Sequence, residues 1–148
     1  MIVLADRRVE VITLFVADLS TSKAFYVDRL ELPIVYEDDV SVVVGFANIL
    51  VNLLNRSEAG TLVAPLDVGA AKDGPTSMLT IAVDDVWATH SRMTEAGVEF
   101  LNGPVDQPWG RRTAAFADSD GFVWELAQEI RLPENRVARQ PLGSSRSA

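Results

Sequence analysis

Residues 14–19 read Leu-Phe-Val-Ala-Asp-Leu, and residues 81–86, which lie 67 positions later, read Ile-Ala-Val-Asp-Asp-Val. Both stretches run from an aliphatic strand end into an acidic helix start, and both continue with an aliphatic residue. The strand and helix patterns on either side of the two stretches also follow each other in the same order. A duplicated βαβββ unit is the simplest interpretation of this repeat.

The first repeat is predicted to contain one strand, one helix and three short strands. Residues 9–17 are rich in β-branched side chains, which is typical of a strand with both faces partly covered. Residues 18–22 supply N-cap candidates for a helix over residues 20–30, with Ser20 or Thr21 best placed, and Pro33 ends the helix. The three short strands are expected over residues 35–39, 41–46 and 49–54.

The second repeat shows the same order of elements. A strand is expected over residues 77–83, and Asp84-Asp85 precedes a helix that runs through about Ala96 and stops at Gly97. Strands are expected over residues 98–105, 113–117 and 122–128, the last two joined by a tight hairpin at residues 118–121. Residues 55–76 lack a sustained period and indicate a linker, and residues 131–148 indicate a mobile tail.

These elements predict an α+β fold in a single domain over residues 1–130, with modules at about 9–54 and 77–129. We expect the two tandem βαβββ modules to form a curved mixed sheet around a cavity, with the helices on the outer face. A cavity between repeats is a usual place for a ligand.

Composition and charge exclude several classes of function. The absence of cysteine excludes disulfides, thiolate zinc sites and cysteine nucleophiles. Residues 131–148 hold four Arg and one Glu, so residues 1–130 hold nine basic and twenty acidic residues, a net charge of −11. An acidic body repels phosphate backbones and anionic lipids, so we expect no nucleic acid and no membrane as partners. With no long apolar run and no signal-peptide core, the chain is expected to be cytoplasmic.

Four segments carry a resemblance to a known family. They are residues 13–19, residues 22–26 running to 30–33, residues 103–104 followed by 108–112, and residues 116–126, which read Phe-Ala-Asp-Ser-Asp-Gly-Phe-Val-Trp-Glu-Leu. In this order, over about residues 9–129, they resemble the vicinal-oxygen-chelate superfamily. That superfamily contains glyoxalase I, bleomycin-resistance proteins, fosfomycin-resistance enzymes and extradiol dioxygenases. The resemblance implies a small-molecule ligand or substrate and a homodimer.

The resemblance also implies where a metal ion would bind. In metal-dependent members, four ligands point into the cavity from the first and fourth strands of both modules, and the matching positions here are Val11, Asn52, Met78 and Glu125. Val11 has no donor atom, and the thioether of Met78 is too soft for the usual divalent ions. We therefore expect no metal cofactor; a divalent ion is disfavoured by these two residues.

Strand alternation then predicts the side chains that line the cavity. If Glu125 faces the cavity, alternation assigns a cavity-facing side to each of the first and fourth strands of the two modules. These sides carry small and partly polar side chains, and the bulky aliphatic residues lie on the sides that face the helices. The predicted lining consists of Val11, Thr13, Phe15, Asn52, Leu54, Met78, Thr80 and Glu125.

Four residues in or near the predicted cavity allow more than one interpretation. Glu125 is either a structural carboxylate or a catalytic or ligand-orienting group in the cavity. Trp109 either anchors its loop or forms an aromatic wall against a flat ligand. Arg112 either pairs with Glu125 or Asp118, or holds an anionic group of the ligand. Phe15 belongs either to the core or to the cavity lining.

The sequence thus predicts a small-molecule binding protein of the bleomycin-resistance type that sequesters a flat, partly cationic ligand without metal. Glu125 would orient the cationic group, and Trp109 and Arg112 would add contacts. The alternatives are a metal-dependent lyase, isomerase or dioxygenase, and a metal-free enzyme in which Glu125 is a general base.

Overall fold

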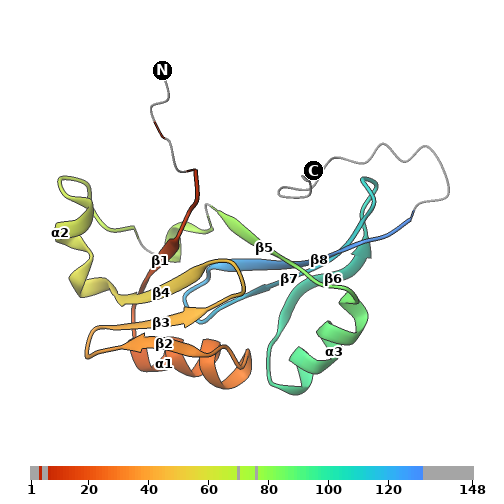
Figure 1. The fold of residues 1–148 in the computed structure, drawn as a ribbon, viewed down its shortest axis with the longest axis horizontal. Helices are drawn as coiled ribbons and strands as arrows, with labels where there is room; N and C mark the ends of the chain where they lie inside the picture. Colours follow the sequence, from red (N-terminus) through yellow and green to blue (C-terminus); the bar gives the residue numbers. More distant parts are fainter. Residues whose placement is uncertain (1–3, 5–6, 70, 76, 132–148) are drawn as a thin grey trace. The chain divides into compact units, whose positions relative to one another are not determined.

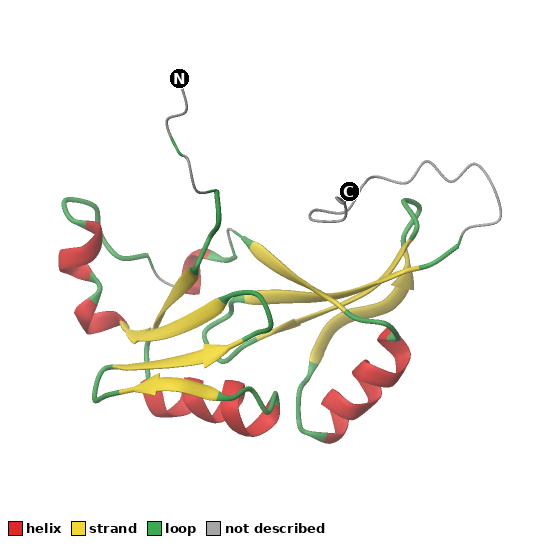
Figure 2. Ribbon diagram, viewed as in Figure 1, coloured by secondary structure: helices red, strands yellow, loops and turns green. Residues whose placement is uncertain are grey.

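The structure, a computed structural model, describes residues 4, 7–69, 71–75 and 77–131. Contacts divide these residues into two compact units. Unit 1 holds the residues up to Gly74 together with Asp118–Gly121, and unit 2 holds Pro75–Ala117 and the residues from Phe122 on. Figure 1 labels the helices and strands along the chain, and Figure 2 colours them by type.

Unit 1 is a four-stranded mixed sheet with one helical segment. Its sheet has the order β1-β4-β3-β2, in which β1 runs parallel to β4 and the other neighbours are antiparallel. The helix α1 continues without a break into a π-helical stretch. The bounds are β1 (Val11–Val16), α1 (Leu19–Lys23), the π-helical stretch (Ala24–Arg29), β2 (Ile34–Glu37), β3 (Ser41–Gly45) and β4 (Leu50–Asn55).

The core of unit 1 lies between α1 and one face of this sheet. Because side chains alternate along a strand, Leu14 and Val16 of β1 point to one face and are 6% and 0% exposed, whereas Val11 on the other face is 41% exposed. The helix packs on β3 and β4. The buried apolar side chains on this face and on the helical segment are Leu14, Val16, Phe25, Tyr26, Val42, Val44, Val51 and Leu53.

Among the predicted N-cap candidates, the preference for Ser20 or Thr21 is wrong. Asp18 is the N-cap residue, with the extended backbone that this position requires, and the Thr21 hydroxyl donates to its carboxylate. Thr21 therefore stabilises the cap residue instead of being it. The helical backbone also ends before Pro33, because Glu31 takes the left-handed conformation with φ of 59°.

Unit 2 repeats the same plan with a longer helix. Its sheet order is β5-β8-β7-β6, and β5 runs parallel to β8. Asp85 caps the helix by accepting from the Ala88 amide at 3.0 Å, and the Gln128 side chain accepts from the Val86 amide at 2.8 Å. The bounds are β5 (Met78–Ala82), α3 (Val86–Glu95), β6 (Phe100–Asp106), β7 (Arg111–Ala117) and β8 (Val123–Glu129).

The α3 side of this second sheet carries the bulky core. Phe116, Trp124 and Leu126 are at most 3% exposed there, and Val86 at the start of α3 is fully buried. The face away from α3 carries Glu125 and the small side chains of Thr113, Ala115 and Ala127.

The segment predicted as a linker contains helical turns. Within residues 55–76 the structure has a 3₁₀ turn (Arg56–Glu58), a four-residue helix α2 (Gly60–Val63) and a second 3₁₀ turn (Ala71–Asp73). Elements this short cannot show a sustained apolar period, which is why the sequence pattern misses them. No helix in the described part of the chain is long and apolar enough to cross a membrane.

The predicted α+β class and the tandem βαβββ modules are confirmed, and each module forms a four-stranded mixed sheet of its own. The repeat offset holds to the residue, since β1 and β5 begin at Val11 and Met78, and α1 and α3 begin at Leu19 and Val86. The enclosed cavity stays a prediction. The predicted mobile tail lies, apart from Arg131, outside the described residues.

Candidate functional site

In unit 1 the predicted lining residues share one face of the sheet. The register pairs Val11 with Leu50, Thr13 with Asn52 and Phe15 with Leu54, and α1 packs on the other face. Asn52 is partly buried, and its Oδ1 atom is buried without a hydrogen-bond partner in the described part of the chain. An unpaired buried acceptor is costly, so this oxygen is available to a donor group of a ligand.

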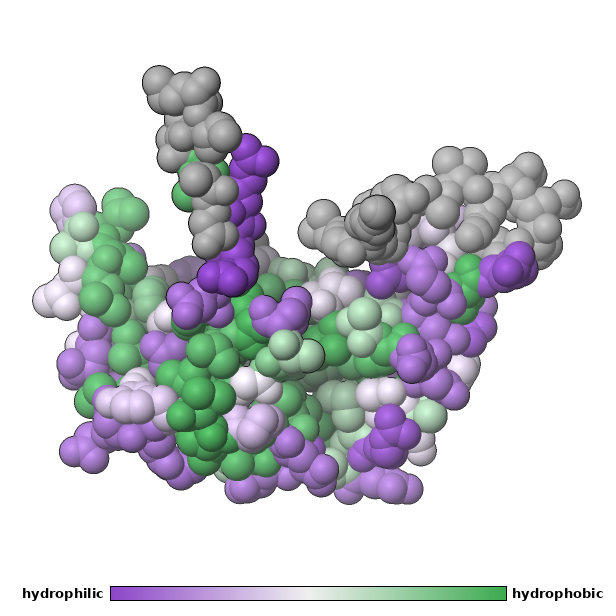
Figure 3. Space-filling model, viewed as in Figure 1, coloured by the Kyte–Doolittle hydropathy of each residue, from purple (hydrophilic) through white to green (hydrophobic). Residues whose placement is uncertain are grey.

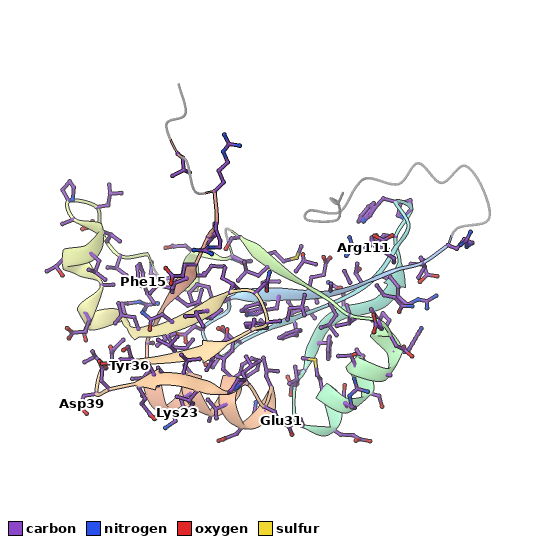
Figure 4. All side chains as sticks on the ribbon, viewed as in Figure 1. Phe15, Lys23, Glu31, Tyr36, Asp39 and Arg111 are labelled. Carbon is purple, nitrogen blue, oxygen red and sulfur yellow. The ribbon has the colours of Figure 1, made fainter. Side chains whose placement is uncertain are left out.

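Phe15 and Leu54 differ in exposure on that face. Leu54 is 8% exposed and belongs to the buried set, whereas Phe15 is partly exposed. Figure 4 labels Phe15 on β1 and Tyr36 on β2. The edge strand β2 is exposed along its whole length: Ile34, Val35 and Tyr36 are 40%, 56% and 55% exposed. Figure 3 shows hydrophobic residues gathered over this β2–β4 part of unit 1.

In unit 2 the predicted lining residues also share one face, on the side away from α3. The register pairs Met78 with Val123 and Thr80 with Glu125. The Thr80 hydroxyl donates a hydrogen bond of 3.1 Å to Glu125 Oε1, so the carboxylate is oriented by its neighbour on the adjacent strand. On the other side Glu125 lies opposite the small side chain of Ala115, which is 7% exposed.

The two modules place these residues in equivalent positions. Thr13 and Asn52 are partners in the β1–β4 register, and Thr80 and Glu125 are partners in the β5–β8 register. The pairing supports the match of Asn52 to Glu125, which the short stretch of residues 48–52 makes less secure in sequence. Each unit therefore presents a threonine beside a side chain with an acceptor oxygen.

This donor set does not fit a hard divalent cation. Of the four positions that metal-dependent relatives use, Val11 offers no donor, Met78 offers a thioether, and only Asn52 and Glu125 offer oxygen. Among the described residues, no group of three or more His, Cys, Asp or Glu side chains could hold a metal ion.

Trp109 lies in the tight turn between β6 and β7. Gly110 has a φ of 91° and donates to the Gln107 carbonyl at 3.1 Å, and the Ile130 amide donates to the Gly110 carbonyl at 3.0 Å. These bonds fix the turn, and Trp109 is 39% exposed on it. Its role as an aromatic wall stays a prediction.

The predicted pairing of Arg112 with Glu125 or Asp118 is wrong. Arg112 lies opposite Gln128 in the β7–β8 register, so its side chain points to the other face from Glu125. Its Nε and Nη2 atoms donate to the two Asp106 oxygens at 2.6 and 3.1 Å. This bidentate bond lowers the pKa of Asp106 and raises that of Arg112. The guanidinium, for which the sequence allows either a structural role or a ligand anion, thus pairs with a carboxylate of the neighbouring strand.

The residue that the sequence analysis misses is Arg111. It lies opposite Glu129 in the register, on the same face as Glu125, and it lines a pocket of about 250 Å³. Residues 82–84 at the end of β5 and residues 127–129 of β8 form the rest of the lining. Two consecutive arginines give no hint in sequence of which one faces which side, because this depends on the phase of the strand. Figure 4 labels Arg111 beside the β6–β7 turn.

Two tandem βαβββ modules, each with an oxygen-bearing side chain on the sheet face away from its helix, define a class of small-molecule binding proteins and enzymes. The sequence profile of the Glyoxalase/Bleomycin resistance protein/Dioxygenase superfamily matches residues 8–126, and the chain belongs to this superfamily. No curated protein matches the sequence significantly.

Solved structures share the fold. A glyoxalase/bleomycin resistance protein/dioxygenase from Nocardioides has a TM-score of 0.76 at 19% identity, covering 90% of this chain and 91% of its own. TnmS3, an antibiotic binding protein from Streptomyces sp. CB03234, has a TM-score of 0.66 at 26% identity and covers 85% and 98%. Lactoylglutathione lyase from Agrobacterium tumefaciens has a TM-score of 0.67 at 20% identity and covers 83% and 94%. Both a binding protein and a lyase thus share this fold.

Proposed function

We propose that the protein binds a flat, partly cationic small molecule without a metal ion, and that Glu125 receives the cationic group. The observation that carries the proposal is the oriented carboxylate: Thr80 holds Glu125 on the sheet face away from α3, among small and apolar side chains. A partly buried carboxylate in such surroundings favours a cationic partner. The net charge of −11 in residues 1–130 attracts cations from a distance.

The similarity to TnmS3 supports binding over catalysis as the first hypothesis, since that protein is an antibiotic binding protein. The donor set at Val11, Asn52, Met78 and Glu125 supports the metal-free part of the proposal. Purified protein should therefore hold no nickel, zinc, manganese or iron after dialysis, as measured by elemental analysis. Near-stoichiometric metal would favour a metal-dependent lyase, isomerase or dioxygenase instead.

The first test is a thermal-shift screen of flat aromatic cations against neutral and anionic compounds of the same shape. A ligand present at ~100 times its Kd stabilises the folded state by about 2.7 kcal/mol, which a melting curve resolves. The cations should raise the melting temperature and their uncharged counterparts should not. Catalysed conversion of a bound compound, lost in Glu125→Gln, would show that Glu125 is a general base in a metal-free enzyme.

The second test measures the affinity of the best cation from that screen for two variants. Glu125→Gln keeps the shape and removes the charge, so the affinity should fall by about 1.5–3 kcal/mol, the scale of a charge-assisted hydrogen bond. Trp109→Ala should weaken binding through lost stacking, by about 0.5–1.5 kcal/mol. The exposed Glu99→Gln is the matched control with the same change of net charge. Equal affinity in all of these proteins would place the ligand elsewhere.

We also propose a homodimer that buries apolar strand or helix surface. The support is the exposed edge strand β2, where Ile34, Val35 and Tyr36 present apolar surface. The outer edge of β2 pairs with no other strand among the described residues. Light scattering should give the mass of a dimer. A chain truncated after Ile130 should give the same oligomeric state, and loss of the dimer would show that residues 131–148 are part of the interface.

A further inference from the structure

Arg111 and Arg112 follow each other on β7 and point to opposite faces of the sheet, and the two guanidinium groups differ in their hydrogen bonds. Arg112 makes two hydrogen bonds to Asp106. The Arg111 side chain is 16% exposed, and its nearest carboxylate oxygen, Glu129 Oε2, lies 3.6 Å from Nε. That distance is too long for a hydrogen bond, and Nε is buried without a hydrogen-bond partner among the described residues.

Glu129 forms an ion pair with this guanidinium but makes no hydrogen bond to Nε. A buried N–H group that has lost its water is costly unless an acceptor replaces that water. Arg111 borders the pocket of about 250 Å³, so a ligand in this pocket can supply the acceptor. The guanidinium presents parallel N–H groups that match a carboxylate or a phosphate. The singly charged carboxylate is repelled less by Asp84 and Glu129, which also line the pocket. One charged group of the ligand is therefore a carboxylate.

The hollow exists because the side chains next to Arg111 are short. Ala82 and Ala127 are partners in the β5–β8 register, one row of same-face side chains away from Arg111 and Glu129. Ala127 is 2% exposed and forms part of the floor. The pocket is smaller than the ~300–1,000 Å³ of sites for drug-sized ligands, so it fits a head group and not a whole large ligand.

The remaining charges of the pocket are acidic. Asp84 and Glu129 both line it, and with Arg111 they give the lining a net charge of −1. A simple anion would gain Arg111 but meet two carboxylates, and a simple cation would meet the guanidinium. A group that carries a carboxylate and an ammonium together matches both kinds of charge.

We propose that this pocket binds the amino-carboxylate head group of a small zwitterionic ligand, as found in an α-amino acid. Arg111 receives the carboxylate, and Glu129 and Asp84 receive the ammonium. The site uses the same sheet face as Glu125, four residues along β8 or about 13 Å away, so the rest of an elongated ligand could extend toward Glu125. The head-group site goes beyond the function proposed above and depends on Arg111 instead of Glu125.

Three compounds that share a phenyl ring separate the charges. L-Phenylalanine carries both groups, 3-phenylpropanoate carries only the carboxylate, and 2-phenylethylamine carries only the ammonium. Each is titrated into the full-length ¹⁵N-labelled protein, and amide shifts are followed by NMR. We expect L-phenylalanine to shift the amides of residues 82–84 and 127–129 saturably, with a Kd at least tenfold lower than that of either single-charge compound. This comparison needs no variant.

Variants of Arg111 then test whether this residue binds the carboxylate. Arg111→Gln should weaken L-phenylalanine binding at least tenfold, and Arg111→Lys, which keeps the charge but loses the parallel N–H groups, should also weaken it. The exposed Arg92→Gln on α3 of the same unit is the control and should bind as the parent does. Glu125→Gln should keep the Arg111-dependent shifts, so failure of the cation site and failure of the head-group site are distinguishable.

The proposal is overturned if none of the three compounds shifts these amides, or if the amine or the propanoate binds as tightly as L-phenylalanine. It is also overturned if a folded Arg111→Gln protein keeps the parent affinity. Binding that depends on Glu125 and not on Arg111 would support the cation site and reject the head-group site.

Discussion

At the scale of single residues, Gly103 shows how backbone geometry fixes an amino acid. It lies in β6, in the irregular stretch where the pairing with β7 shifts register, and its φ is +84°. A Cβ atom there would lie 2.4 Å from the Thr113 carbonyl oxygen and 2.8 Å from Ala114 Cα. Both neighbours are backbone atoms of the adjacent strand and cannot move aside cheaply. Gly103→Ala should therefore destabilise the protein by about 2–4 kcal/mol, from the positive φ and the clash together.

Two other glycines separate these two causes. Gly74 has φ of +84° but nothing within 4 Å of a Cβ, and Gly60 in α2 has neither restriction. Gly74→Ala should cost about 1–2 kcal/mol, and Gly60→Ala should be neutral or slightly stabilising. Urea unfolding of the three variants measures the series. Equal costs for the Gly103 and Gly74 variants would mean that β7 moves away and the contact adds nothing.

Residue roles on strands could be predicted from sequence only where the phase of alternation is known. Glu125, Thr80 and Met78 share a face as expected, because the repeat and the strand pattern fix the phase of β5 and β8. In β7 the run Arg111-Arg112-Thr113 offers no apolar alternation, so the two arginines could not be assigned to faces. Their roles follow from the cross-strand partners, Glu129 and Asp106, which only the register reveals.

At the scale of elements, the Asp106–Arg112 bond joins β6 to β7 and should make the pairing sensitive to acid. The hydrogen bond from Arg112 holds the pKa of Asp106 below its usual 3.8. A carboxyl group with a lowered folded-state pKa adds stability that is present above pH about 4 and is lost as the pH falls through the folded pKa. The stability difference between the parent and Asp106→Asn should therefore shrink below pH 4.

The unfolding free energy of Asp106→Asn is compared with that of the parent at each pH, because other carboxylates titrate in the same range. The Thr21 hydroxyl lowers the pKa of Asp18, and the Val40 amide lowers that of Asp38. Both are common to the parent and the variant, so their effects cancel in the difference. Unfolding in urea from pH 2.5 to 7 supplies the measurement. A difference that is constant over this range would mean that Asp106 gains nothing from Arg112.

The order and type of the main elements follow from sequence, but their ends and the short turns do not. The strands begin or end within a few residues of the expected positions, and α3 fills residues 86–95 of its predicted span. Helix ends depend on caps: Asp18 replaces the expected Ser20 or Thr21 because it alone has extended backbone before the first turn. Between residues 55 and 76, short turns form on local hydrogen bonds, such as Ser57 to Asn55, which leave no apolar period.

At the scale of the whole molecule, a turn from the second repeat completes the first unit. Asp118–Gly121 connects β7 to β8, yet it belongs to unit 1. Asp120 accepts from the Ala17 amide at 2.9 Å, and Asp118 accepts from the Tyr26 hydroxyl at 2.6 Å, across 92 positions of sequence. The duplication is visible in the sequence. The assignment of this turn to unit 1 is not, because a simple hairpin requires the same acidic turn residues.

Two tyrosines provide a matched test of this long-range bond. Tyr26 is fully buried and donates to Asp118, which is 7% exposed, whereas Tyr36 is 55% exposed and donates to Asp38 at 2.8 Å. Replacing Tyr26 with Phe removes the donor and leaves a buried carboxylate with one partner fewer, which should cost about 1–3 kcal/mol in unfolding free energy. Tyr36→Phe loses the same kind of bond where water replaces it, so the cost should be below about 0.5 kcal/mol. Urea unfolding compares the two variants under the same conditions. Equal costs would show that the turn at residues 118–121 does not stabilise unit 1 through Tyr26, whereas the expected difference would show that the first module depends on a turn encoded within the second.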